Sequence, residues 1–138
     1  MRINHLALVT SNATQMDSFL VNVAGLLPHR VDGWYSVPDS GVSVHVIEIS
    51  EAVVPVSEDL HHEYRHIAME VDSLRSVLAA ALRENYTVFQ MSMTGDERPV
   101  EASDDALQFG LRTIFVRDSD RNLWEFVQRG FSDSALFE

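Results

Sequence analysis

The stretch Leu111–Gln128, LRTIFVRDSDRNLWEFVQ, decides the fold. Its apolar pattern predicts a strand over Thr113–Val116, a tight turn over Asp118–Asn122 and a second strand over Leu123–Gln128. Glu125 stands in that second strand among bulky apolar neighbours, where a carboxylate is costly unless a positive group holds it. The chain has no lysine, so the positive group is an arginine or a metal ion. Three histidines in similar strand settings favour the metal.

The composition excludes several classes of function. A chain of 138 residues is long enough for one domain with its own core. Without cysteine it has no thiolate metal site and no cysteine nucleophile, and without lysine it has no Schiff-base chemistry. A formal net charge of −11 repels nucleic acid and anionic lipid, so we expect neither as a partner. No run approaches membrane-spanning length or a signal peptide, which predicts a soluble cytoplasmic protein.

The first part of the chain, about residues 1–50, predicts a β-α-β-β-β unit. Ile3–Val9 is an apolar run of strand length that contains His5. Ser11 or Asn12 can cap a helix whose apolar residues follow at helical spacing up to Gly25. Two further strand regions complete the unit, namely Leu26–Val37, interrupted at Asp32-Gly33, and Val42–Ile49, which contains His45.

The pattern then repeats after a polar connector over residues 51–63. Asn4-His5-Leu6-Ala7-Leu8 is echoed by Arg65-His66-Ile67-Ala68-Met69. Asp72 is the expected cap of the helix that follows, and Tyr86–Met93 the next strand. Thr94–Asp105 reads as a solvated acidic loop, Ala106–Val116 and Leu123–Gln128 close a second unit over about residues 64–128, and residues 129–138 form a tail.

Side-chain alternation places the polar strand residues on one face. His5, His45, His66 and Glu125 each lie opposite larger apolar neighbours in their strands, so the apolar side chains can pack beneath the helices. The polar residues would then line the open face of a curved sheet. Two imidazoles and a carboxylate on rigid strands suit Fe(II), Mn(II), Zn(II), Ni(II) or Co(II), with coordination positions left for substrate or water.

These residues resemble the motifs of the vicinal oxygen chelate superfamily, which includes glyoxalase I, bleomycin- and fosfomycin-resistance proteins, methylmalonyl-CoA epimerase and extradiol dioxygenases. The start "NHLAL", the segment "RHIAMEVDSL" and the ending "FVRDSDRNLWEF" carry the resemblance, which covers nearly the whole chain. It implies an α+β fold of two tandem βαβββ units whose curved mixed sheets form a cup. Ser119-Asp120-Arg121 replaces the usual Pro-Asp-Gly, so we expect a looser turn.

The resemblance implies a divalent metal held by His5, His66 and Glu125, with His45 at the position where glyoxalases place a glutamate. A histidine there departs from glyoxalase I chemistry. His45 is therefore either a fourth ligand or an acid/base catalyst, and the catalytic roles fall to His45 and Glu125. The expected function is a metal-dependent enzyme, of lyase, isomerase or ring-cleaving dioxygenase type, that chelates a small substrate through adjacent oxygens. The resemblance also implies a homodimer.

Other interpretations stay open at this point. The same cup without metal can sequester a small molecule, as in bleomycin-resistance-type relatives. Glu125 can instead pair with Arg112 or Arg117, and Trp34, Tyr35 and Phe109 can line a pocket or belong to the core. His62-Glu63-Tyr64-Arg65-His66 also spells the HExxH motif of zinc proteases, which requires a helix at this point.

Overall fold

The structure is a computed structural model that describes residues 1–50, 65–102 and 112–130. The chain divides into two compact units, Met1–Val56 (unit 1) and Ser57–Glu138 (unit 2), and each is described by itself. Both units have the α+β architecture that the sequence predicts. The connector 51–63, Phe109 and residues 131–138 of the tail lie outside the described residues.

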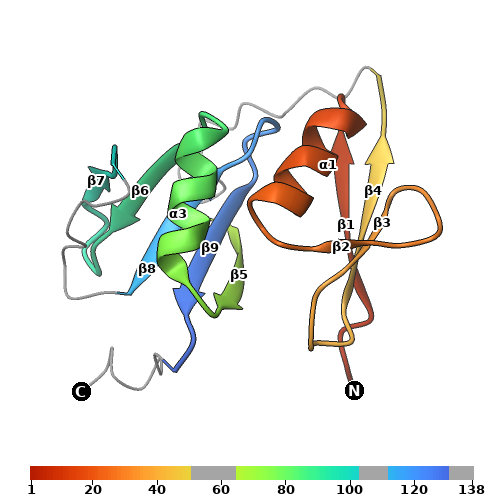
Figure 1. Cartoon of the computed structure of the whole chain (residues 1–138), viewed down its shortest axis with the longest axis horizontal. Helices are drawn as coiled ribbons and strands as arrows, with labels where there is room; N and C mark the ends of the chain where they lie inside the picture. The colour runs from red at the N-terminus through yellow and green to blue at the C-terminus, as the bar shows by residue number, and fades with distance from the viewer. Residues whose placement is uncertain (51–64, 103–111, 131–138) are drawn as a thin grey trace. The chain divides into compact units, whose positions relative to one another are not determined.

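Unit 1 is a four-stranded mixed sheet with one helix on one of its faces (Figure 1). Its elements are β1 (His5–Thr10), α1 (Ala13–Asn22), β2 (Leu27–Pro28), β3 (Trp34–Ser36) and β4 (Ser43–Glu48). The strands lie in the order β1-β4-β3-β2. The first and last strands, β1 and β4, are parallel neighbours, and the remaining pairs are antiparallel.

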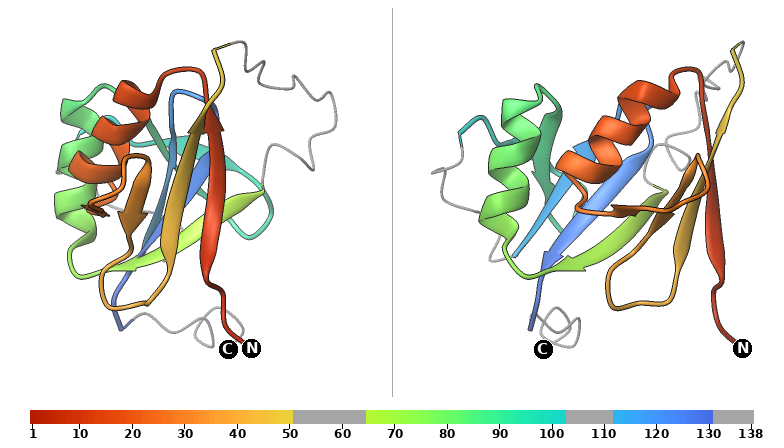
Figure 2. Two further views of the ribbon diagram at one scale, coloured as in Figure 1. Left: turned by 90° about the vertical axis from the view of Figure 1, so that its right-hand side faces the viewer. Right: turned by 45° about the vertical axis from the view of Figure 1, so that its right-hand side comes forward.

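Unit 2 repeats this arrangement with one more strand. Its elements are β5 (His66–Val71), α3 (Leu74–Arg83), β6 (Thr87–Met91), β7 (Glu97–Pro99), β8 (Thr113–Arg117) and β9 (Leu123–Gln128). The strand order is β5-β9-β8-β6-β7, and β5 and β9 are again parallel neighbours. Figure 2 shows α1 and α3 each running along one side of its own sheet. Neither helix, nor any other in the described residues, is long and apolar enough to cross a membrane.

Short polar side chains begin both helices. Asn12 caps α1 by accepting a hydrogen bond from the Gln15 amide at 3.0 Å, as the sequence predicts. In α3 the prediction is one residue too early, because the cap is Ser73, whose Oγ accepts from the Ser76 amide at 3.2 Å, and not Asp72. The Asp72 carboxylate instead lies 2.8 Å from the Arg129 guanidinium.

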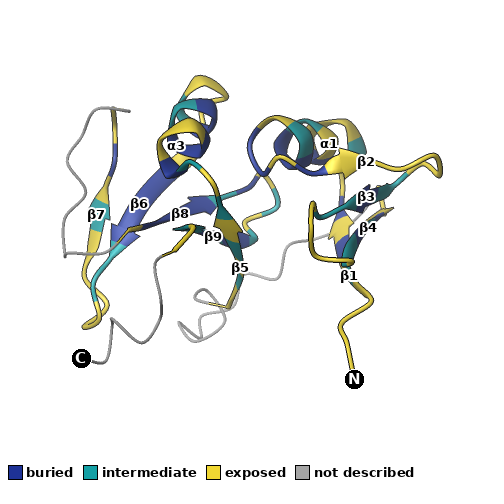
Figure 3. Ribbon diagram, turned by 60° about the horizontal axis from the view of Figure 1, so that its bottom comes forward, coloured by how far each residue is buried: buried dark blue, intermediate teal, exposed yellow. Residues whose placement is uncertain are grey.

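Each sheet buries the face that its helix covers. In β1 and β4 the side chains of Leu8, Val44 and Val46 are buried. Ala7, which precedes Leu8 and points to the other face of the sheet, is exposed. In unit 2 the largest buried side chains on this side are Trp124 and Phe126, and Figure 3 shows how much of β6 and β8 is buried. We call the opposite side of each sheet its open face. Alternation along the strands places all four predicted site residues there, as expected.

Two strand predictions are corrected in detail. The region Leu26–Val37 holds two short strands, β2 and β3, which pair antiparallel. The segment Thr94–Asp105 is not entirely a solvated loop, because Glu97–Pro99 forms β7 at the edge of the sheet and Val100 is buried. Polar side chains do not prevent an edge strand, because its outward face meets water.

The turn between β8 and β9 is closed by Asp118, so the expectation of a looser turn is wrong. The buried carboxylate accepts hydrogen bonds from the Asp120 amide at 3.0 Å, the Asn122 amide at 2.9 Å, the Asn122 side-chain amide at 2.9 Å and the Trp124 indole at 3.0 Å. Arg121 adopts the left-handed conformation, with φ of 64°, at the position where glycine is usual. The side-chain bonds of Asp118 therefore compensate for the missing glycine.

The Asp118→Asn substitution should lower the free energy of unfolding by about 1–3 kcal/mol, because one of the two carboxylate oxygens would become an amide N–H group that faces hydrogen-bond donors. These donors are either the backbone amides of Asp120 and Asn122 or the side chains of Asn122 and Trp124. Urea denaturation measures this change. Asp39→Asn, the same substitution in an exposed turn, is the control, and should change stability by less than about 0.5 kcal/mol. Equal effects at the two positions would contradict the account.

The stability of the chain should also depend on the protonation of Asp118. Burial raises the pKa of this carboxyl, and the hydrogen bonds from Trp124 and Asn122 oppose the rise without cancelling it. A group that binds its proton more tightly when folded makes stability fall as pH rises from its unfolded pKa through its folded pKa. The stability difference between wild type and Asp118→Asn should therefore shrink as the pH rises above about 4, the ordinary pKa of an aspartate. A difference that grows with pH would contradict this sign.

Candidate functional site

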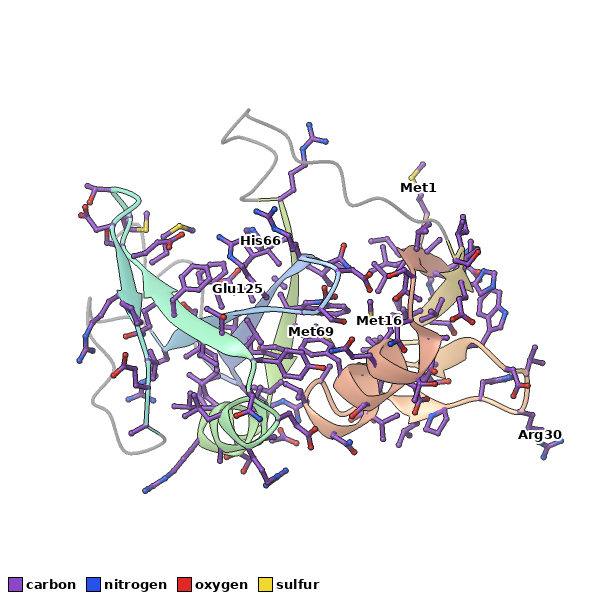
Figure 4. All side chains as sticks on the ribbon, turned by 90° about the horizontal axis from the view of Figure 1, so that it is seen from above. Met1, Met16, Arg30, His66, Met69 and Glu125 are labelled. Carbon is purple, nitrogen blue, oxygen red and sulfur yellow. The ribbon has the colours of Figure 1, made fainter. Side chains whose placement is uncertain are left out.

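The open face of unit 2 brings His66 and Glu125 together. His66 is the first residue of β5, and Glu125 lies in β9 opposite Ala68, two residues further along β5. The imidazole Nε2 and the carboxylate Oε2 are 3.1 Å apart, and Figure 4 shows the two side chains beside each other. Both are partly exposed, at 34% and 20% of the side chain, so a small ligand can reach them.

Aromatic side chains form a floor beside this pair. Phe115 lies opposite Glu125 in the register of β8 and β9, and its ring meets the His66 ring edge-on at 5.5 Å. Phe89 stacks against Phe115 at 5.5 Å, and together with Leu123 these rings form a buried cluster with Met91 against it. The cluster fixes the strand positions from which His66 and Glu125 project, and it makes the surroundings of the pair apolar.

The open face of unit 1 groups His5, Trp34 and His45. The Trp34 and His45 rings are stacked, with centroids 4.2 Å apart and planes 8° from parallel. The His5 ring meets the same indole edge-on at 5.2 Å. One indole therefore contacts both imidazoles. Stacking restricts the His45 ring to one orientation, which is the condition for an imidazole that must exchange a proton or donate to a ligand at a fixed point.

The neighbouring aromatic residue, Tyr35, serves the other face of the sheet. Its hydroxyl donates a 2.7 Å hydrogen bond to the Asp17 carboxylate of α1, and its side chain is buried. Burial raises the pKa of this phenol, and the Asp17 carboxylate raises it further, so the hydroxyl remains a donor. Of the three aromatic residues that the sequence leaves undecided, Tyr35 is thus core and Trp34 lies on the open face, while Phe109 lies outside the described residues.

The two sites occupy matched positions in their units. In each unit the first strand begins with a histidine and has an alanine two residues later, and this alanine pairs with the polar residue of the last strand. These residues are His5, Ala7 and His45 in unit 1 and His66, Ala68 and Glu125 in unit 2. The aromatic residue opposite that polar residue is also matched, being Trp34 in unit 1 and Phe115 in unit 2. The repeat in the sequence is therefore a repeat of the site.

Sequence reasoning did not identify these two aromatic residues as part of the site. The sequence leaves Trp34 open between pocket and core, and it predicts Phe115 only as part of a strand. Their role follows from which strands are neighbours, since β3 and β8 lie beside the last strand of each unit. The available signal is the spacing to the last strand, because Trp34 lies 11 residues before His45 and Phe115 lies 10 residues before Glu125.

Gly33 sets the position of Trp34. Its carbonyl accepts a 2.7 Å hydrogen bond from the Val46 amide, and its φ is +79°. A Cβ at this residue would lie 2.9 Å from the Val46 carbonyl oxygen, and that neighbour is backbone that cannot swing away. Only glycine lets the chain approach β4 this closely immediately before Trp34, which explains the interruption that the sequence shows at Asp32-Gly33.

The predicted ligands fall on the two units, two on each. Within the described residues, no three histidine, aspartate or glutamate side chains gather so as to hold a metal ion. The structure joins His66 to Glu125 and groups His5 with His45 around Trp34. A site that combines ligands of both units stays a prediction.

The interpretation of residues 62–66 as a protease motif is wrong at His66, because this residue is not in a helix. HExxH chemistry needs both histidines on one helix, where a spacing of four places them on the same face. His66 begins strand β5 instead, and its side chain lies against Glu125 and Phe115. His62 lies outside the described residues.

Each unit pairs its first and last strands in parallel and covers one face of its sheet with a helix, and unit 2 adds the edge strand β7. The chain therefore has the fold of the vicinal oxygen chelate superfamily. Among solved structures, the oxidase ChaP-H1 matches with a TM-score of 0.67 at 20% identity, covering 94% of this chain and 96% of that chain. FosX, a genomically encoded fosfomycin resistance protein from Listeria monocytogenes, matches with a TM-score of 0.64 at 14% identity, covering 100% and 98%.

A third similar structure is TnmS3, an antibiotic-binding protein from a Streptomyces species, with a TM-score of 0.56 at 13% identity, covering 93% of this chain and 95% of that one. No family model and no curated protein matches the sequence. At these identities the similarity establishes the fold. The resemblance read from the sequence motifs is confirmed at this level.

Replacing Gly33 by alanine should destabilise the chain by more than the roughly 1–2 kcal/mol that a left-handed backbone costs a non-glycine residue, because the new Cβ also meets the Val46 carbonyl. Gly41→Ala is the matched control, with a φ of +69° and no atom within 4 Å of the new Cβ. Thermal unfolding compares the two variants, and near-ultraviolet circular dichroism reports the setting of Trp34. Equal losses in both variants would show that the approach to Val46 has no effect.

Proposed function

We propose that the chain is a divalent-metal-dependent enzyme that binds a small molecule through two oxygens on adjacent atoms. The observation that carries this proposal is the 3.1 Å contact between His66 and Glu125 on an open face, beside an apolar aromatic floor. Lyase, isomerase and ring-cleaving dioxygenase chemistry all use this kind of binding. The overall fold, shared with oxidases and a fosfomycin resistance protein, accommodates such activities.

The geometry of the His66–Glu125 pair fits two ligands of one cation. Donor atoms about 2.1 Å from a metal, at angles of about 90–110°, lie roughly 3.0–3.4 Å apart, and the observed separation is 3.1 Å. Imidazole and carboxylate together suit iron, manganese, zinc, nickel or cobalt. His5 is proposed as the third ligand, and His45 as a fourth ligand or as the acid/base group. A bound cation would supply Lewis-acid polarisation of the substrate oxygens.

The protein's own residues would then perform the remaining tasks. Phe115 and Trp34 present apolar rings next to the polar side chains, which excludes water from the reacting atoms. The indole of Trp34 keeps the His45 imidazole in one orientation, so that its nitrogen can accept or return a proton at a fixed position. We also infer a cytoplasmic homodimer whose partner is a small molecule and neither nucleic acid nor a membrane.

The alternative is a metal-free protein that sequesters a small molecule. It is favoured by the partly exposed indole of Trp34 on the open face of unit 1, since aromatic side chains bind planar ligands by stacking. The antibiotic-binding protein TnmS3 has the same fold. In this case the 3.1 Å contact between His66 and Glu125 is a hydrogen bond that holds the wall of the pocket.

Metal analysis separates the two proposals. Wild-type protein incubated with Ni²⁺ and Zn²⁺ and then desalted should retain one equivalent of metal per site, measured by plasma mass spectrometry and calorimetric titration. His66→Ala and Glu125→Ala should each weaken uptake by about a hundred-fold or more, since even residues that only support a ligand are worth ten- to hundred-fold. Glu84→Ala, which removes an exposed carboxylate at the C-terminal end of α3, should retain wild-type uptake.

The His5→Ala and His45→Ala variants extend the same titration. A large loss in both indicates four ligands, and a loss in His5→Ala alone indicates three ligands with His45 left for proton transfer. Failure of the wild type to take up either Ni²⁺ or Zn²⁺ would leave the small-molecule binder as the better account.

A further inference from the structure

Arg117 is a cation on the same open face as His66 and Glu125. It is the last residue of β8, two residues after Phe115. It pairs with Leu123 of β9, and Leu123 also pairs with His66 of β5. Its guanidinium carbon is 5.1 Å from the centre of the Phe89 ring, and its Nη2 is 3.6 Å from the Glu97 carboxylate of β7. Its side chain is 25% exposed. The ring beneath it holds the charged group at the surface of the aromatic floor.

The register places this cation within reach of a ligand bound at the pair. Glu125 lies opposite Phe115, so Glu125 and Arg117 are diagonal neighbours on adjacent antiparallel strands. The Cα atoms of such neighbours are about 7–8 Å apart, and long side chains close that distance further. A molecule of a few heavy atoms can therefore touch both the His66–Glu125 pair and the guanidinium.

The construction of the sheet does not require an arginine here. The two units match at their histidine, alanine and aromatic positions, and the residue of unit 1 that corresponds to Arg117 is Ser36, which lies opposite Ser43. A serine thus suffices at this place in the repeat. The contact with Glu97, at 3.6 Å, is longer than a hydrogen bond.

We propose that Arg117 binds an anionic group of the ligand, next to the His66–Glu125 pair. The planar guanidinium has five N–H donors in a fork that matches a carboxylate. A chain with 21 acidic residues and 10 arginines repels anions in general, so a bound anion needs such a local cation. Resting on the proposed function, the substrate class is a small carboxylic acid with an oxygen on the adjacent carbon, that is, a 2-oxo or 2-hydroxy acid.

Oxalate is a suitable probe, because it is a small anion with oxygens on adjacent carbons. We would titrate it into wild-type protein with and without Zn²⁺ and follow the amide NMR shifts. Saturable shifts are expected at Arg117 and its strand neighbours. Arg117→Gln should weaken oxalate binding by about ten-fold or more, the loss expected for a charge-assisted contact, and Arg117→Lys should fall in between because it keeps the charge without the fork.

Two further variants separate binding from structure. Arg98→Gln removes the same charge from β7 at a position where the side chain alternates to the other face of the sheet, and it should bind oxalate like the wild type. Glu97→Gln removes the carboxylate that competes for Arg117, so it should tighten oxalate binding. If Arg117 served only the structure, Glu97→Gln would lower the melting temperature and leave oxalate affinity unchanged or weaker.

The outcomes for the two proposals are distinguishable. Zinc uptake without any effect of Arg117→Gln on oxalate affinity overturns the anion position and leaves the metal site standing. Oxalate binding that depends on Arg117 in a protein that takes up no metal supports the anion position and overturns the proposed enzyme. Absence of oxalate binding by the wild type in both conditions overturns the anion position.

Discussion

The parallel pairing of the first and last strand in each unit is the constraint on which the rest of the structure depends. It makes β1 a neighbour of β4 and β5 a neighbour of β9, although the residues involved are far apart in the sequence. Because one helix covers one face of each sheet, the paired strands expose the same set of alternate side chains on the other face. The contact between His66 and Glu125 follows directly from this register.

The repeat provides a scaffold, and the differences between its two copies provide the chemistry. Both units place a histidine and an aromatic ring beside the polar residue of the last strand. Unit 1 has an imidazole at that polar position and a serine further along, whereas unit 2 has a carboxylate and an arginine. The two units therefore carry different polar groups at matched positions of the repeat.

Most of the fold was predictable from the sequence, because hydrophobic alternation and the repeated histidine motif report on burial directly. The sequence placed His5, His45, His66 and Glu125 on the open faces, and the register agrees. The cap of α3 was predicted one residue early, since aspartate and serine in sequence are both good caps and only the backbone geometry selects Ser73.

The roles of Trp34 and of Asp118 could not be predicted from local patterns. The first depends on which strands become neighbours, and the second on hydrogen bonds that form only when the turn and the indole are both in place.

The closed turn after β8 has a consequence for how the length of this chain can vary. Side chains alternate along β9, so inserting one residue between Asp118 and Leu123 would slip the pairing and exchange Glu125 with its bulky neighbours Trp124 or Phe126. Insertions and deletions tolerated there should therefore occur in even numbers. The length of this segment therefore determines which side chains of β9 lie on the open face and which lie in the core.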